Sequence, residues 1–127
     1  MKLRIKGNSL RLRVTRSELA RLLEGAVVAE TIHFGPGPDQ SLTYALISGS
    51  HADAVKVLYR ERIVTASISA DALRGWSDED QVGLYASIDI GTAGALEVAI
   101  EKDFACLDRK DEENADTFAN PHAGQSC

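Results

Sequence analysis

Two short runs near the start of the chain, residues 2–6 and 9–14, alternate hydrophobic and charged residues. This period of two is typical of β-strands with one buried face. Gly7-Asn8 separates the runs, and glycine at the first central position suits a two-residue type II′ turn. The pattern predicts a β-hairpin with one apolar and one cationic face, in which Arg4 lies opposite Arg11. The predicted cationic face consists of Lys2, Arg4, Arg11 and Arg13.

A helix is predicted directly after the hairpin, over about residues 16–24. Thr15 and Glu18 have the spacing of a capping box, in which the threonine oxygen and the glutamate carboxylate satisfy the free amides of the first turn. Gly25 is a suitable end, because glycine adopts the left-handed conformation at little cost. Apolar residues recur at helical spacing at Leu19, Leu22, Leu23, Ala26 and Val27.

The remaining pattern predicts further strands and one short helix, at about 71–76. The predicted strands cover residues 27–34, 41–48, 54–60, 62–69, 82–90 and 95–104. Most connections are too short for parallel crossovers, so the sheet is expected to be largely antiparallel. The fold class is therefore α+β, a single domain of about seven strands for which a barrel is one arrangement. Residues 1–104 are expected to form its core and 105–127 an acidic, largely irregular segment packed on it, and no internal repeat is evident.

Length and composition are those of one globular domain: 127 residues, 44% hydrophobic and 26% charged. No apolar run reaches the roughly 18 residues that a membrane span needs, and the alternating start is unlike a signal peptide. Two cysteines do not make a disulfide framework, so reduced thiols and a cytoplasmic location are expected. The net charge of −5 argues against a general affinity for nucleic acid.

Charge is distributed unevenly along the chain. Residues 1–16 contain six cations and no acid, whereas residues 97–118 contain eight acids and three cations. One interpretation is that the acidic stretch packs against the cationic face of the hairpin, and this one is favoured. The other is that the hairpin binds an external anion, such as a phosphate-bearing ligand or a nucleic acid backbone. The scarcity of aromatic residues lowers the case for single-stranded nucleic acid.

A metal site is one hypothesis for the C-terminal segment, which contains Cys106, His122 and Cys127. Thiolate and imidazole are ligands of zinc and related transition metals, and Asp103 or Asp108 could supply a fourth ligand. The spacing matches no zinc finger or ribbon. The alternatives are a buried Cys106, a disulfide between the two cysteines, and a disordered terminus.

Catalytic motifs are not found: the chain has no Gly-x-Ser-x-Gly, no phosphate-binding loop and no His-Glu-x-x-His. His33 precedes the loop Gly35–Asp39, and this region could hold a histidine or carboxylate base. His51 lies in a predicted turn. A single histidine in a loop is more often simply a polar surface residue.

Three blocks resemble a family of small uncharacterised bacterial proteins, a domain of unknown function. They are residues 1–9, residues 75–83 and the block Glu-Lys-Asp-Phe-Ala-Cys-Leu-Asp at 101–108. Such relatives usually have an aromatic residue followed by Pro-Asn-Pro, whereas this chain has Phe118-Ala119-Asn120-Pro121. The resemblance implies a bacterial cytosolic domain and no particular reaction.

These observations favour a small binding or interaction module, with a transition-metal site at Cys106, His122 and Cys127 as its sharpest version. One alternative is a small enzyme with a base near residues 33–39. Another is an anion or nucleic-acid binder that uses the cationic hairpin. No membrane partner is expected, nucleic acid is disfavoured, and the sequence identifies no small ligand, protein partner or oligomeric state.

Overall fold

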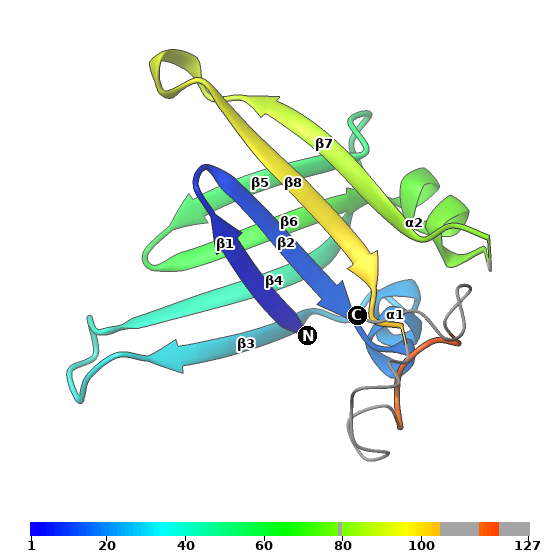
Figure 1. Cartoon of the computed structure of the whole chain (residues 1–127), viewed down its shortest axis with the longest axis horizontal. Helices are drawn as coiled ribbons and strands as arrows, with labels where there is room; N and C mark the ends of the chain where they lie inside the picture. The colour runs from blue at the N-terminus through cyan, green and yellow to red at the C-terminus, as the bar shows by residue number, and fades with distance from the viewer. Residues whose placement is uncertain (79, 105–114, 120–127) are drawn as a thin grey trace.

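The computed structural model describes residues 1–78, 80–104 and 115–119, which form two four-stranded sheets and two helices (Figure 1). The elements in chain order are β1 (Lys2–Lys6), β2 (Ser9–Val14), α1 (Arg16–Leu23), β3 (Val28–His33), β4 (Ser41–Gly49), β5 (Val55–Arg60), β6 (Ile63–Ser69), α2 (Ala70–Ser77), β7 (Gly83–Asp89), the 3₁₀ turn η1 (Gly91–Ala93) and β8 (Ala95–Lys102). Both helices were predicted from the sequence within two residues of their observed ends. Neither helix is long and apolar enough to cross a membrane, within the described residues.

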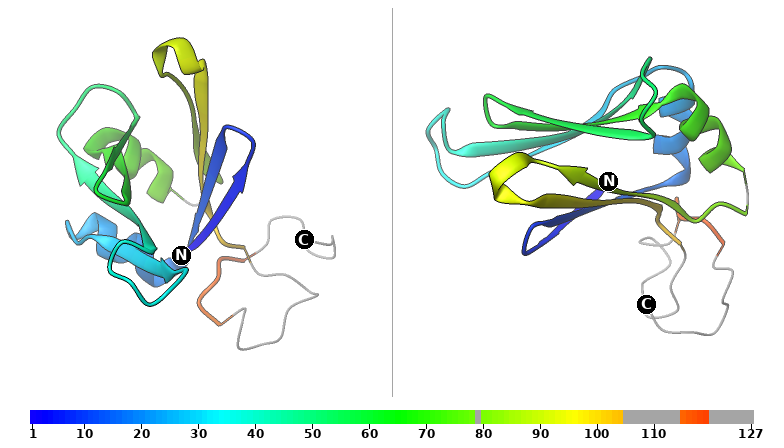
Figure 2. Two further views of the ribbon diagram at one scale, coloured as in Figure 1. Left: turned by 90° about the vertical axis from the view of Figure 1, so that its left-hand side faces the viewer. Right: turned by 90° about the horizontal axis from the view of Figure 1, so that it is seen from above.

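The strands are divided between two sheets that face each other, with the helices at one end (Figure 2). Sheet A has the order β1-β2-β8-β7 and sheet B has the order β3-β4-β6-β5. Four of the six strand pairs are antiparallel, as expected, but the central pairs β2–β8 and β4–β6 are parallel. The barrel named as one arrangement does not form, because the described strands divide into two separate sheets of four. The argument from short connections failed for the central pairs because each joins strands that are distant in the chain.

The chain contains a structural repeat that the sequence did not reveal. Each half consists of a hairpin, a helix and a second hairpin: β1-β2-α1-β3-β4, then β5-β6-α2-β7-β8. The first hairpin of each half shares a sheet with the second hairpin of the other half. The helix caps Thr15 and Ser69 are 54 residues apart, and this offset also relates the pairs Lys2–Arg13 and Lys56–Ser67. The halves are therefore topologically equivalent, and the expectation of no internal repeat is wrong.

The predicted register of the first hairpin is confirmed. Arg4 lies opposite Arg11, and the turn at Gly7 has a φ of +56°. The equivalent turn of the second half has Glu61 and Arg62, with φ values of 50° and 65°. Side chains rarely adopt this left-handed conformation, so the second turn is strained where the first is not.

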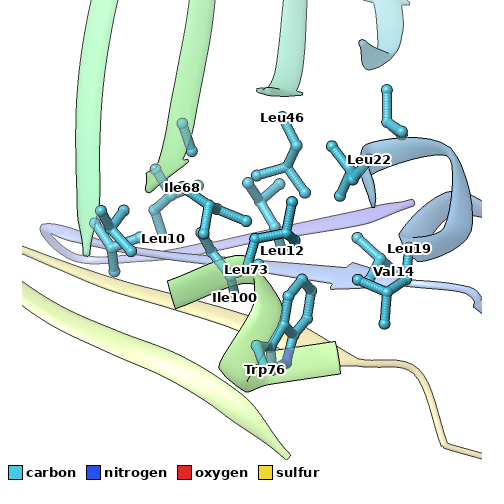
Figure 3. Packing of buried hydrophobic residues seen from close by; sticks show 14 residues of the cluster. Leu10, Leu12, Val14, Leu19, Leu22, Leu46, Ile68, Leu73, Trp76 and Ile100 are labelled. Carbon is cyan, nitrogen blue, oxygen red and sulfur yellow. The ribbon is translucent and has the colours of Figure 1, made fainter. Parts of the chain in front are cut away.

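Both helices begin at caps, and both bury one face in the core (Figure 3). Thr15 and Glu18 form the predicted capping box, and the Ser69 hydroxyl accepts a hydrogen bond from the amide of Ala72 at 3.1 Å. Trp76 is completely buried, and its indole N–H donates to the carbonyl of Val82 at 3.2 Å. The core includes Leu10, Leu12, Val14, Leu19, Leu22, Leu46, Ile68, Leu73, Trp76, Val98 and Ile100.

Candidate anion site on sheet A

Five cations share the outer face of sheet A, where β1 and β2 lie side by side. Because Leu10, Leu12 and Val14 of β2 point into the core, the alternating residues of this hairpin point outward. The structure therefore brings together all four residues that the sequence predicted for the cationic face. Lys6 belongs to the same face by alternation, although the sequence analysis left it out. We call this set the cationic face: Lys2, Arg4, Lys6, Arg11 and Arg13.

Part of the cationic face is neutralised by the beginning of the acidic stretch. Glu101 of β8 accepts ion pairs from the Nε atoms of Arg11 at 3.2 Å and Arg13 at 3.7 Å. Lys2 Nζ lies 3.2 Å from Asp103, whose side chain is only 4% exposed. The favoured interpretation of internal pairing is thus correct for these three cations, because β8 lies directly beside β2.

Two cations lack such a partner. Arg4 and Lys6 are exposed and make no ion pair with any described residue. Both border a concave region of about 490 Å³ on the outer face of sheet A, together with Arg11. A smaller hollow of about 170 Å³ lies along the same hairpin and includes Arg4 and Arg13. The unpaired positive charge therefore lies where the surface is hollowed.

The opposite side of the larger hollow is lined by Tyr85, Ser87 and the carboxylate of Glu97. The Tyr85 hydroxyl donates to Glu101 at 2.7 Å, and the Ser87 hydroxyl donates to Glu97 at 2.8 Å. Burial and then the hydrogen bond to Glu101 raise the pKa of Tyr85 to about 12. Tyr85 therefore stays protonated and remains a donor at neutral pH. The sequence analysis missed this side of the site because it depends on β7, β8 and β2 being neighbours.

The structural repeat shows that the fold does not need these arginines. At an offset of 54 residues, the positions of Arg4, Arg11 and Arg13 correspond to Leu58, Thr65 and Ser67 on the outer face of sheet B. The position of Glu101 likewise corresponds to Ile47, as the registers of the two parallel pairs show. Only the positions of Lys2 and Lys6 also have a cation in the second half, where they are occupied by Lys56 and Arg60. The arginine and glutamate cluster is thus a feature of one face and not of the architecture.

The described part of the C-terminal segment, residues 115–119, contacts α1 and the end of β8. The carboxylate of Asp116 accepts a hydrogen bond from the backbone amide of Ser17 at 3.1 Å. Its carbonyl oxygen accepts one from the backbone amide of Arg16 at 3.0 Å. The ring of Phe118 meets that of Phe104 edge-on, with centroids 6.1 Å apart. The amine of Lys102, close to the Phe118 ring, donates to the carbonyl of Asp78 at 2.6 Å.

The sequence predicts a metal site near the end of the chain. Cys106, His122 and Cys127 lie outside the described residues, as does Asp108. Asp103 is described and pairs with Lys2. The described ranges contain no cluster of three or more histidine, cysteine or acidic side chains suited to a metal ion. The zinc hypothesis remains a prediction.

The two described histidines differ in their surroundings. His33 ends β3 opposite Ser41; its side chain is exposed and makes no hydrogen bond or ion pair to a described residue. His51 is partly buried, and both of its ring nitrogens are hydrogen-bonded, to Asp53 and Ser67. The region 33–39 thus shows no base with an orienting partner, whereas the turn at His51 does.

The fold defines an α+β protein made of two equivalent halves, with an arginine-rich hollow on one of its two sheets. Residues 1–122 match the model of a family of unknown function, DUF7009. The chain belongs to this family, in agreement with the resemblance of its three sequence blocks to a domain of unknown function. No curated protein matches the chain, and no solved structure matches it either.

Proposed function

We propose that this protein is a binding module that recognises a compact anion, of the phosphate type, on the cationic face of sheet A. The observation that carries the proposal is the position of Arg4. Its guanidinium has no counter-ion among the described residues, lies opposite Arg11, and borders a hollow. Like charges directly opposite on neighbouring strands are destabilising, by up to about 1 kcal/mol. A bound anion would turn this repulsion into attraction.

Arginine suits this role because its planar guanidinium donates two parallel hydrogen bonds to a phosphate or carboxylate. Residues directly opposite in an antiparallel pair have Cβ atoms roughly 5 Å apart, so one tetrahedral anion can contact both side chains. Lys6 borders the same hollow and adds a third positive charge. The three side chains belong to a short two-residue-turn hairpin, which holds them in a fixed register.

The other side of the hollow limits the size of the ligand. Glu97 lines this side, and Tyr85, which also lines it, is hydrogen-bonded to the carboxylate of Glu101. A long polyanion crossing the whole face would meet these carboxylates and the net charge of −5. A small ligand can place its anionic group on Arg4 and Arg11 and offer hydroxyl or amine donors to Glu97. This arrangement favours a small phosphorylated molecule over a nucleic acid backbone.

Titration calorimetry with inorganic phosphate and pyrophosphate at low salt tests the proposal on the full chain. Arg4→Ala is expected to weaken binding about tenfold, the effect of losing one charge-assisted contact. Arg60→Ala is the matched control, because Arg60 occupies the position equivalent to Lys6 on the other sheet. Saturable binding that Arg4→Ala weakens and Arg60→Ala preserves supports the site. Absence of binding, or equal loss in both variants, contradicts it.

A further inference from the structure

The His51 ring is held in one tautomer by its two hydrogen bonds. Nδ1 lies 2.6 Å from the carbonyl oxygen of Asp53, and Nε2 lies 2.8 Å from the hydroxyl oxygen of Ser67. A carbonyl oxygen can only accept, so in the neutral ring Nδ1 carries the proton and Nε2 carries the lone pair. The Ser67 hydroxyl is then the donor to Nε2. A nucleophile, a base and an orienting group are thus connected in series, as activated serine nucleophiles require.

Gly49 makes room for this arrangement. A Cβ atom at position 49 would lie 2.8 Å and 2.9 Å from Cδ2 and Nε2 of His51, and it would also collide with the Ser67 hydroxyl. Any larger residue would therefore displace the histidine or the serine. In the other half, the positions of Gly49 and Ser67 are occupied by Asp103 and Arg13. The fold thus forms the equivalent corner of the other half without the trio Gly49, His51 and Ser67. The architecture therefore does not require these three residues.

Lys56 adds a positive charge beside the serine. It lies directly opposite Ser67 in the β5–β6 pair, and residues in opposite positions share a face of the sheet. Lys56 is exposed, whereas Ser67 and His51 are partly buried. An ammonium group in this position can stabilise negative charge that develops on a substrate attached to Ser67.

From this geometry we propose that Ser67 is a nucleophile, with His51 as its general base, that accepts the acyl group of an activated carboxylic ester. The Ser67 oxygen bonds to the acyl carbon while its proton moves to Nε2 of His51. The bond between the acyl carbon and the alcohol oxygen breaks, and the leaving alcohol takes that proton. The product is acyl-Ser67, which water hydrolyses to the acid. The carbonyl of Asp53 positions His51 and does not touch the substrate.

This site is independent of the proposed anion site. Ser67, His51 and Lys56 belong to sheet B and the turn before β5, whereas the cationic face belongs to sheet A. Failure of either proposal therefore leaves the other intact.

Labelling of the full-length protein with an alkyl fluorophosphonate tests the nucleophile. The serine oxygen forms a bond to phosphorus, the P–F bond breaks, fluoride leaves, and His51 takes the proton. Ser87 is an internal control, because it is exposed and is hydrogen-bonded to a carboxylate instead of a histidine. Peptide mass spectrometry is expected to show that Ser67 is labelled at least about tenfold faster than Ser87. This factor is a small part of the rate acceleration that a general base typically contributes.

Two histidine variants make the test specific. His51→Gln is expected to reduce the rate of labelling at Ser67 to that of Ser87, and His33→Gln is expected to leave it unchanged. Thermal melting of each variant identifies any loss of folding, and Lys56→Ala is a second variant that leaves the trio intact and should slow labelling several-fold. Equal labelling of Ser67 and Ser87 in the folded wild-type protein overturns the proposal. So does labelling of Ser67 that persists unchanged in a folded His51→Gln variant.

Discussion

Replacement of Glu101 by glutamine should increase the affinity of the cationic face for phosphate. The carboxylate of Glu101 now neutralises Arg11 at 3.2 Å and Arg13 at 3.7 Å, so it competes with any external anion for these guanidiniums. Glutamine keeps the size of the side chain and can still accept the hydrogen bond from Tyr85. The change therefore removes one negative charge with little change in shape.

The size of the effect follows from Coulomb's law. An anion on the far side of the Arg11 guanidinium would lie roughly 6 Å from the Glu101 carboxylate. Two unit charges at that separation repel by about 0.7 kcal/mol in a water-like dielectric. For doubly charged phosphate the repulsion is about 1.4 kcal/mol, which corresponds to about tenfold in affinity. We expect an increase in affinity of three- to tenfold, which shrinks as salt screens the charges.

Isothermal titration calorimetry with inorganic phosphate, at two salt concentrations, measures this change. Asp71→Asn is the matched control, because it gives the same change in net charge at an exposed position of α2 whose ion pair is with Arg74. A second readout is the titration of Tyr85, whose pKa of about 12 should fall towards its ordinary value of 10.0 in Glu101→Gln. If Glu101→Gln and Asp71→Asn change phosphate affinity equally, only net charge matters and the assigned site is wrong.

Three further predictions concern the stability of the fold. The hydrogen bond from the Ser17 hydroxyl lowers the pKa of the Asp116 carboxyl below its ordinary value of 3.8. The ionised carboxylate therefore stabilises the folded protein above that pH, and this stabilisation is lost as the pH falls. Urea unfolding should show that Asp116→Asn destabilises the protein at about pH 7 but not at about pH 2. Arg62→Gly should raise the free energy of unfolding by about 1 kcal/mol, because it removes a non-glycine residue from the left-handed conformation. Gly7→Ala should lower the free energy of unfolding by a similar amount, because it places a side chain in that conformation. The opposite directions of the two effects, measured in chemical denaturation, test the geometry of the turns. Trp76→Ala should cost about 3–5 kcal/mol, and a loss below about 1 kcal/mol in chemical denaturation would contradict its complete burial.

Local features were predictable from the sequence wherever one short segment determines them. The register of the first hairpin follows from a glycine turn between two alternating runs, and the capping box at Thr15 and Glu18 follows from residue type and spacing. Four of the five residues of the cationic face were therefore predicted correctly as neighbours, and only Lys6 was left out. The acidic stretch 97–118 was also predicted as its internal partner, but the particular pairing of Arg11 with Glu101 was not, because it depends on β8 lying beside β2.

The repeat escaped detection because the two halves share a pattern of buried apolar positions but few identical residues. Leu19 and Leu73 are identical at the offset of 54, but the next buried position has Leu22 in one helix and Trp76 in the other. A signal was present, since each cap is followed by a buried apolar residue at the fourth and seventh positions. The parallel central pairs could have been inferred only after the halves were recognised as equivalent.

The equivalence of the halves separates what the fold requires from what it permits. Inward positions keep apolar residues in both halves, as at Leu12 and Ala66, because both sheets must cover one core. Outward positions carry no such constraint, since Arg11 in one half corresponds to Thr65 in the other and both halves form the same hairpin. A cross-strand arginine pair costs free energy that the threonine version avoids. The proposed anion site would offset this cost on sheet A, and Arg11→Thr is expected to preserve the fold while it weakens phosphate binding.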